Sequence, residues 1–336
     1  MDIKNNTAEN LTITTINGQI QVRPNEGYVL IKYYLLSFLF KGIYIETKVK
    51  FKDMNSFSLR LPTKFLFNAK MSINHSLFYR YLVLPTTVIL PWSRMRLRRQ
   101  LIKVKAILKN KLDSKYGCKE KEVVSTFNSA TGQVILTNGS LITKYYPLPY
   151  LFKTVTLESE YYLNDLHMAT YMKMTKFLFN GNLYFHYGNR FKKLRINYLR
   201  ILPFSRSMLS KKMDQLMSKY YELKGVTTVN SENRIVTFKH ATGVITLTKD
   251  YLVTSYYPIP YLFRKNLTTT YIPLKEFKQF IYGRMTGFLF TGRFSFLYGP
   301  LLVPYRVGYL RILPSARKQL AARLQQVYKY IDNIIE

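Results

Sequence analysis

The sequence predicts an α+β fold built from three tandem homologous modules of about 111 residues, each mostly antiparallel β-structure with a C-terminal amphipathic helix. Three observations support this prediction: sequence blocks recur at a fixed offset, apolar residues recur at helical spacing, and turn signals separate strand-like runs. Of the 336 residues, 47% are hydrophobic, which is enough to form packed cores, so we expect a folded chain.

The repeat is visible in three separate blocks. The run KYYLLSFLFK at 32–41 recurs as KYYPLPYLFK at 144–153 and as SYYPIPYLFR at 255–264, so the two intervals between copies are nearly equal. TKFLFN at 63–68 recurs at 175–180 and, as TGFLFT, at 286–291, and the tripeptide Ile-Leu-Pro recurs with the same offsets. The polar runs KYGCKEKE and VNSEN read as linkers, so we predict modules at 1–121, 122–232 and 233–336. The first copy departs most, and it has Ala69 where the others have glycine.

The first part of each module reads as strands. The most apolar stretch, Tyr28 to Ile45, is interrupted by lysines and is shorter than the roughly 20 residues that span a bilayer, so we expect core strands. Asn180-Gly181 lies between two apolar runs and suits a tight hairpin turn, and Asn138-Gly139 is a second turn signal.

A helix is expected to close each module, after the shared Ile-Leu-Pro. The prolines at 91, 203 and 314 break the preceding structure, and Ser93, Ser205 and Ser315 are potential caps. The apolar positions are spaced by four, three and four residues, so each helix has one apolar face to dock. These positions are Leu97, Leu101, Val104 and Leu108; Leu209, Met213, Leu216 and Tyr220; and Leu320, Leu324, Val327 and Ile331.

The charge of the chain points to a polyanionic partner. Lys and Arg total 51 against 18 Asp and Glu, a net charge of +33, although codon bias in an AT-rich genome would also raise the lysine content. The single cysteine, Cys118, excludes an internal disulfide and a zinc site built on several thiolates, which fits a reducing compartment. The N-terminal run MDIKNNTAEN lacks the features of a signal or transit peptide. We therefore expect a protein of a virion or the cytoplasm, neither secreted nor membrane-spanning.

Basic residues cluster on the predicted helices, most densely on the first. They could bind phosphates, could form an ordinary solvated helix face, or could lie on an anionic membrane. The first module carries a net charge of +15, more than the others, so it is expected to make the main contact. The candidate nucleic-acid-binding residues are Arg94, Arg96, Arg98, Arg99, Lys103, Lys105, Lys109 and Lys111 on the first helix, Lys211 and Lys212 on the second, and Arg317, Lys318 and Arg323 on the third.

Catalytic motifs are not found. The four histidines show no metal-ligand spacing, and neither a phosphate-binding Gly-rich loop nor a Gly-x-Ser-x-Gly motif occurs, so we expect no enzyme, catalytic residue, metal or cofactor. One acidic position, Asp53, Asp165 and Glu276, recurs in all three copies. It is interpreted as an ion pair, with the equally recurrent Arg94, Arg206 and Arg317 as candidate partners, or as a cap on a short helix, rather than as part of a metal site.

The recurrent aromatic block has two readings. Tyr33, Tyr34, Phe38 and Phe40, with counterparts through Phe152 and Phe263, could stack on unpaired bases. They alternate with Leu36 and Leu39 in a run that lacks a polar face, so core packing is the preferred interpretation.

These observations predict a non-enzymatic structural protein of a large nucleoprotein assembly, such as a virus or phage particle. Three similar modules can form a pseudo-threefold unit or an arc, and the basic helices would contact the backbone of DNA or RNA. Other assembly proteins are the expected further partners, and no small-molecule substrate is expected. The alternatives are a ribosomal or organellar ribonucleoprotein component, a metal-dependent nuclease with carboxylates drawn from different modules, and a membrane-surface protein.

Overall fold

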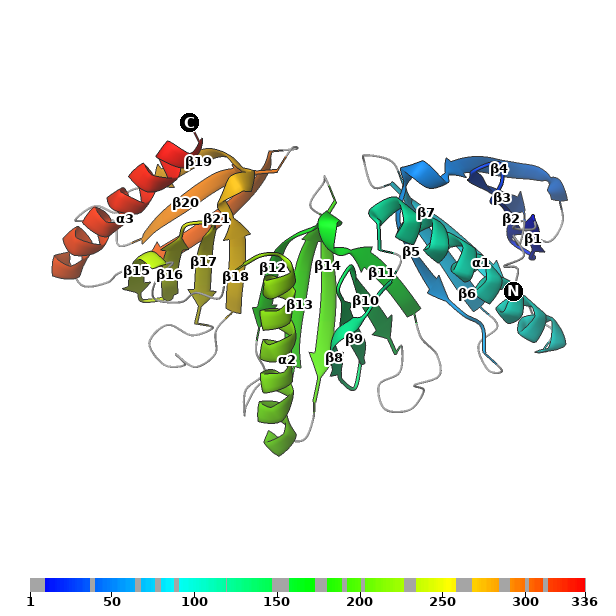
Figure 1. Ribbon diagram of the computed structural model, residues 1–336, viewed down its shortest axis with the longest axis horizontal. Coiled ribbons are helices and arrows are strands. Elements are labelled where there is room, and N and C mark those ends of the chain that lie inside the picture. The colour runs from blue at the N-terminus through cyan, green and yellow to red at the C-terminus, as the bar shows by residue number, and fades with distance from the viewer. Residues whose placement is uncertain are drawn as a thin grey trace, which may run out of the picture. The chain divides into compact units, whose positions relative to one another are not determined.

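The computed structural model describes residues 10–36, 40–63, 68–75, 80–87, 91–118, 120–146, 157–172, 180–188, 192–200, 203–226, 234–257, 268–283, 291–299, 302–310 and 314–335. In these residues the fold is mixed α+β, with antiparallel sheets and three α-helices (Figure 1). The chain divides into two compact units, residues 1–164 and 165–336. Within the described part, no helix has both the length and the apolar character that crossing a membrane requires.

The first unit contains two sheets and the helix α1 (Pro91–Tyr116). The four-stranded sheet has the order β1-β2-β3-β4, with strands β1 (Leu11–Thr14), β2 (Gly18–Arg23), β3 (Tyr28–Leu36) and β4 (Phe40–Lys50). The 3-10 helix η1 (Phe51–Asp53) leads from β4 to the seven-stranded sheet, whose order is β7-β6-β5-β11-β10-β9-β8. Its strands are β5 (Met54–Arg60), β6 (Asn68–His75), β7 (Arg80–Thr87), β8 (Val123–Asn128), β9 (Gly132–Thr137), β10 (Ser140–Tyr145) and β11 (Leu157–Tyr162).

The core of the first unit forms around α1. The predicted positions Leu97, Leu101, Val104 and Leu108 are buried, together with Leu112 one turn later. They belong to one apolar cluster that also contains residues of both sheets, among them Ile13, Ile20 and Val29 of the first sheet and Phe57, Leu59 and Ile73 of the second. The burial of this stripe fixes which side of α1 faces solvent.

The second unit contains the helices α2 (Pro203–Leu223) and α3 (Pro314–Ile335). Its seven-stranded sheet has the order β14-β13-β12-β18-β17-β16-β15, and a three-stranded sheet has the order β19-β20-β21. The first contains β12 (Leu166–Met172), β13 (Asn180–Tyr187), β14 (Lys192–Leu199), β15 (Arg234–His240), β16 (Gly243–Thr248), β17 (Tyr251–Tyr256) and β18 (Thr268–Pro273). The second contains β19 (Phe277–Gly283), β20 (Thr291–Tyr298) and β21 (Val303–Leu310). The 3-10 helix η4 (Leu274–Glu276) belongs to this unit, whereas η2 (Leu163–Asp165) begins in the first unit and ends at the first residue of the second.

Both helices of the second unit bury the predicted positions. Leu209, Met213, Leu216 and Tyr220 of α2 and Leu320, Leu324, Val327 and Ile331 of α3 are all buried. The α3 side chains share an apolar cluster with Phe294, Phe296 and Val307 of the three-stranded sheet, along which α3 lies in Figure 1.

The starts of the helices agree with the prediction in one respect and differ in another. Each α-helix begins at the expected proline, Pro91, Pro203 or Pro314, because proline fits the first helical position, where its missing N–H is not needed. Ser93, Ser205 and Ser315 lie inside the helices and not before them, so their interpretation as N-caps is wrong.

One of the two predicted turns is correct. Asn138-Gly139 connects β9 to β10, and the Thr137 hydroxyl donates to the carbonyl of Ser140 at 3.0 Å. The hairpin turn at Asn180-Gly181 is wrong, because both residues lie in β13 and pair with β14. The glycine is needed there for space and not for a turn: a Cβ at Gly181 would overlap the ring of Tyr198, its partner across the ladder.

The polar run around Lys121 carries structural contacts. The Lys121 ammonium lies 9% exposed between the carboxylates of Asp113 on α1 and Glu160 on β11. The seven-stranded sheet contains strands from before and after this residue, and the first compact unit extends to residue 164. The module boundaries at 121 and 232 stay a prediction that follows from the sequence repeat.

Other sequence-based expectations concern β3, β4 and the recurrent acid. The stretch Tyr28 to Ile45 does form strands, in β3 and β4, apart from residues outside the described part. Tyr34 is buried and Tyr33 is 36% exposed, whereas Phe38 and the aromatic counterparts Phe152 and Phe263 lie outside the described residues, as does the side chain of Phe40. Asp53, Asp165 and Glu276 each end a 3-10 helix, and the N-caps of η1 and η4 are Lys50 and Pro273, so the capping interpretation is wrong for these two.

Candidate nucleic-acid interface

The solvent face of α1 carries an exposed line of one tryptophan and three cations. Trp92, Arg96, Arg99 and Lys103 are spaced by four, three and four residues, so they share one face of a helix with 3.6 residues per turn. The buried stripe has the same spacing on the opposite face. Trp92 is 71% exposed, and the three cations are exposed as well. We call these four residues the α1 line.

The other candidate cations of α1 lie beside this line, and some have structural partners. Arg98 donates from Nη1 to the carbonyl of Pro62 at 3.3 Å, and Lys105 pairs with the Glu158 carboxylate at 2.7 Å. The exposed Lys111 has its ammonium 5.8 Å from the centroid of the Phe51 ring. Arg94 and Lys109 are half-buried. Some of the eight predicted residues are therefore exposed cations, whereas others, such as Arg98 and Lys105, hold α1 against other segments of its unit through a hydrogen bond or an ion pair.

The two other helices do not reproduce the α1 line. At the repeat offsets the corresponding residues are Phe204, Met208, Lys211 and Gln215 on α2 and Ser315, Gln319, Ala322 and Gln326 on α3. The remaining predicted cations, Lys212, Lys318 and Arg323, are exposed, and Arg317 is half-buried. α1 has nine basic residues against one acid, whereas α2 has four basic residues and two acids.

The arginine position shared by all three copies makes a structural contact in the second copy. Arg206 is buried, and its Nε donates to the carbonyl of Arg200, just before α2, at 3.0 Å. A buried guanidinium that satisfies a carbonyl has little access to a phosphate, so Arg206 is a poorer candidate than the cations of the α1 line.

Trp92 was not among the predicted site residues, although it is the only tryptophan of the chain. Its signal in the sequence is its position in the first turn of the most basic helix, four residues before Arg96. An exposed indole offers a flat apolar surface, and neighbouring guanidinium and ammonium groups bind phosphate oxygens. Together they form a surface suited to a strand that presents both bases and phosphates.

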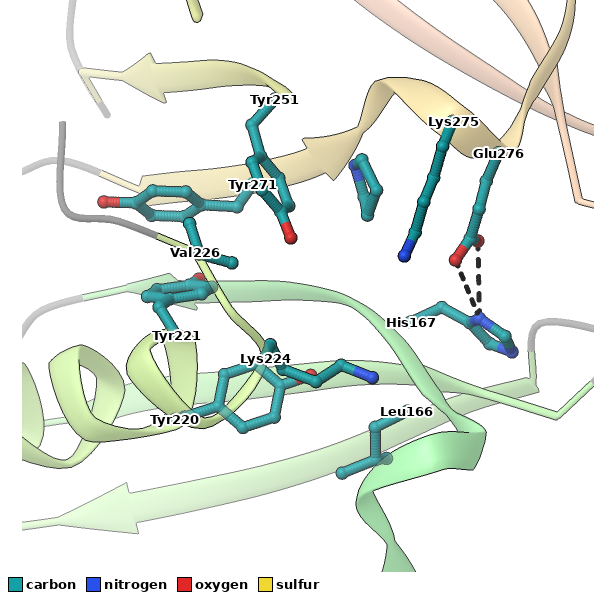
Figure 2. A pocket seen from close by; sticks show the side chains of 11 residues that line it. Leu166, His167, Tyr220, Tyr221, Lys224, Val226, Tyr251, Tyr271, Lys275 and Glu276 are labelled. Carbon is teal, nitrogen blue, oxygen red and sulfur yellow. Dashed lines mark hydrogen bonds and ion pairs between the residues drawn. The ribbon is translucent and has the colours of Figure 1, made fainter. Parts of the chain in front are cut away.

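A pocket in the second unit is a separate candidate site. It has a volume of about 60 Å³ and lies where the end of α2 meets β17, β18 and η4. Figure 2 shows Lys224 and Lys275 approaching the pocket from opposite sides, and Glu276 directed toward His167. The pocket is lined by Leu166, His167, Tyr220, Tyr221, Lys224, Val226, Tyr251, Tyr271, Pro273, Lys275 and Glu276.

The recurrent acid of the third copy does form an ion pair. A Glu276 carboxylate oxygen lies 3.3 Å from Nδ1 of His167. Burial raises the pKa of Glu276, but the hydrogen bond and the positive charge of His167 outweigh burial and leave the pKa below its usual value. Burial lowers the pKa of the nearby Lys224.

The pocket is rich in hydroxyl groups. Burial raises the pKa of Tyr220 and of Tyr221, so both side chains stay neutral. Their hydroxyls have no hydrogen-bond partner among the described residues. Two ammonium groups and these hydroxyls suit a small anion, but the volume is too small for a nucleotide. In the described ranges, no three His, Cys, Asp or Glu side chains are grouped as a metal site would need.

Comparison with known proteins finds no family model that matches the chain and no curated protein similar enough to count as a relative.

Proposed function

We propose that this chain is a triplicated, non-enzymatic structural protein of a large nucleoprotein assembly, a virus or phage particle being the first candidate. It contacts the backbone of DNA or RNA through α1, and neighbouring assembly proteins cover other surfaces. The observation that carries the proposal is the α1 line, three exposed cations beside an indole that is 71% exposed.

The triplication is supported by the order of elements. The two seven-stranded sheets have the same strand order, each joining three strands that precede a helix to four that follow it. The helices bury residues at the same repeat positions. A chain of equivalent modules offers repeated surfaces, which suits an architectural role better than a single catalytic centre.

A nucleic acid fits α1 better than a membrane surface does. A helix that lies on a bilayer inserts a broad apolar face, but the apolar stripe of α1 is buried in its own unit. The solvent side presents three large apolar side chains, Trp92, Met95 and Ile102, on the same helical face as the exposed cations. Cations around a single aromatic group match a polymer of phosphates and bases.

The direct test uses the fluorescence of Trp92, which reports on this helix alone because the chain has no other tryptophan. We expect single-stranded DNA and RNA to quench the emission at low salt, because a stacked base changes the surroundings of the indole. Anionic vesicles should leave the spectrum unchanged. A blue shift with vesicles and no response to nucleic acid would contradict the proposal and favour a membrane surface.

A second assay addresses the nuclease alternative. The chain is incubated with plasmid DNA and with RNA in the presence of Mg²⁺ or Mn²⁺. We expect binding without strand cleavage. Metal-dependent cleavage that co-purifies with the protein and disappears in a Glu276→Gln variant would overturn the non-enzymatic proposal.

A further inference from the structure

The same junction between strands occurs once in each unit. In the first unit, β5 pairs with β11, with Ser58 opposite Ser159 and Phe57 opposite Glu160. In the second unit, β12 pairs with β18, with Thr170 opposite Thr270 and Ala169 opposite Tyr271. At the offsets of the sequence repeat, Thr170 is the counterpart of Ser58 and Thr270 is the counterpart of Ser159. The two junctions therefore have the same register.

Each of the two strands that form this junction has one further counterpart in the sequence repeat, and each of these counterparts lies at the edge of a sheet. β4 is the sequence counterpart of β11 and β18, and it lies at the edge of its sheet with β3 as its neighbour. β19 is the counterpart of β5 and β12, and it lies at the edge of its sheet beside β20. Within the described residues no strand pairs with the outer edge of either one.

The exposure of the side chains agrees with this reading. Lys48 of β4 is exposed, whereas its counterpart Glu160 is buried. Gln279 of β19 is exposed, whereas its counterpart Met168 is buried. Large apolar side chains are exposed on both edge strands, among them Ile45 at 53% and Ile281 at 56%. An open edge of this kind is a template for another strand, and apolar side chains there favour its being covered.

We propose that β19 of one chain pairs with β4 of a second copy, which repeats the internal junction between molecules. The shared register places Ile281 opposite Thr47 and Phe280 opposite Lys48. The two partner surfaces differ, so the contact is heterologous and each copy can bind one neighbour through β4 and another through β19. Such a contact produces either a closed ring or an open filament, and both are forms of a structural assembly. The inference does not depend on nucleic-acid binding.

The experiment uses the full chain and two variants, each blocked at one edge. Thr47→Lys places a charge on β4 and Ile281→Lys places one on β19, and edge lysines oppose pairing. Wild type should form oligomers whose mass rises with concentration in sedimentation velocity, whereas each variant alone should be monomeric. An equimolar mixture should give a dimer of twice the monomer mass and nothing larger, because one wild-type β19 and one wild-type β4 remain.

Controls separate this outcome from a general effect of charge. Val123→Lys changes an exposed residue of β8, an edge strand outside the junction, and should associate like wild type. A second measurement uses Cys118→Ser chains that carry either Thr47→Cys or Ile281→Cys. Oxidation of their mixture should cross-link the two chains, because directly opposite residues have Cβ atoms about 5 Å apart.

Salt distinguishes this proposal from the proposed function. Association of two chains that each carry a net charge of +33 should strengthen with salt, whereas binding to nucleic acid should weaken. A wild-type chain that stays monomeric at high concentration and high salt would overturn the inference. So would a mixture of the two blocked variants that stays monomeric and fails to cross-link.

Discussion

The ring of Tyr198 lies over Gly181, its partner in the ladder between β13 and β14, and the Tyr198 hydroxyl donates to the carbonyl of Met172 at 2.5 Å. The same arrangement recurs at Gly292 and Tyr309, where the hydroxyl donates to the carbonyl of Gly283 at 2.7 Å. In the first copy the corresponding pair is Ala69 and Thr86. The first copy therefore has an alanine in place of the glycine, and its partner is a threonine that lacks the large tyrosine ring.

Gly181→Ala should destabilise the chain because the new Cβ would overlap the Tyr198 ring. We expect a cost of roughly 1–3 kcal/mol, as for other overpacked sites. In a Tyr198→Thr background the same glycine change should cost much less. Urea unfolding of the four members of this double-mutant cycle measures the coupling. Equal costs of Gly181→Ala in both backgrounds would show that the two residues do not compete for space.

Truncation of the buried stripes tests the packing of the helices. Leu101→Ala, Met213→Ala and Leu324→Ala remove side chains that are 0% exposed, so each should cost roughly 2–5 kcal/mol. Exposed Met208 on α2 provides a control, and Met208→Ala should be close to neutral. Denaturant unfolding measures all four. If the stripe variants lose no more stability than Met208→Ala, the apolar positions of these helices are not packed in the cores.

The sequence predicted those elements that leave a periodic pattern. The stripes of the helices and their proline starts follow from local spacing and chemistry, and so does the Asn138-Gly139 turn. Long-range relationships left no such signal. The role of Gly181 depends on a tyrosine of the neighbouring strand β14, and the pairing of β5 with β11 joins segments from either side of α1.

Parts of the candidate site were also beyond sequence reasoning. The sequence predicted the high charge of α1. It did not show that Arg98 and Lys105, unlike the exposed cations, contact Pro62 and Glu158, because these two residues lie on other segments. The recurrent arginines were candidate partners in an ion pair with Glu276, whereas the structure pairs Glu276 with His167, far earlier in the chain.

The His167–Glu276 pair predicts a pH dependence. The folded pKa of Glu276 lies below its usual value of 4.5, so its contribution to stability is present above that value and is lost as the pH falls through the folded pKa. Glu276→Gln should therefore be less stable than wild type near pH 6, and the difference should shrink toward pH 3. Thermal unfolding across this range measures it. A difference that stays constant with pH would mean that the carboxylate charge contributes nothing.

The buried cation Lys121 gives a test in the first unit. Its ammonium lies 2.5 Å from Glu160 and also contacts Asp113, which accepts a hydrogen bond from Tyr162 at 2.7 Å. Lys121→Met leaves two carboxylates without their cation, so it should cost about 3–5 kcal/mol. Arg23→Gln, which removes the cation of an exposed pair with Glu26, should leave the stability nearly unchanged. Similar costs in chemical denaturation would contradict the buried network.

The most direct test of the proposed function is the salt dependence of nucleic-acid binding by a variant in which Arg96, Arg99 and Lys103 become Gln. Arg98 is kept because it fastens α1 to Pro62. The comparison variant changes three exposed cations of α3 to Gln, the sequence-predicted Lys318 and Arg323 together with Lys329, so both variants lose the same charge and the pair tests whether binding is confined to α1. Thermal melts establish that both variants fold.

Affinities for duplex DNA, single-stranded DNA and RNA are measured by anisotropy of labelled nucleic acid over a series of salt concentrations. The plot of log affinity against log salt should be linear for wild type. The α1 variant should flatten its slope by just under one unit per lost phosphate contact, roughly 2.7 on duplex DNA, and the α3 variant should change it much less. A slope that the α1 variant leaves unchanged, or that both variants change equally, would contradict a nucleic-acid interface on α1.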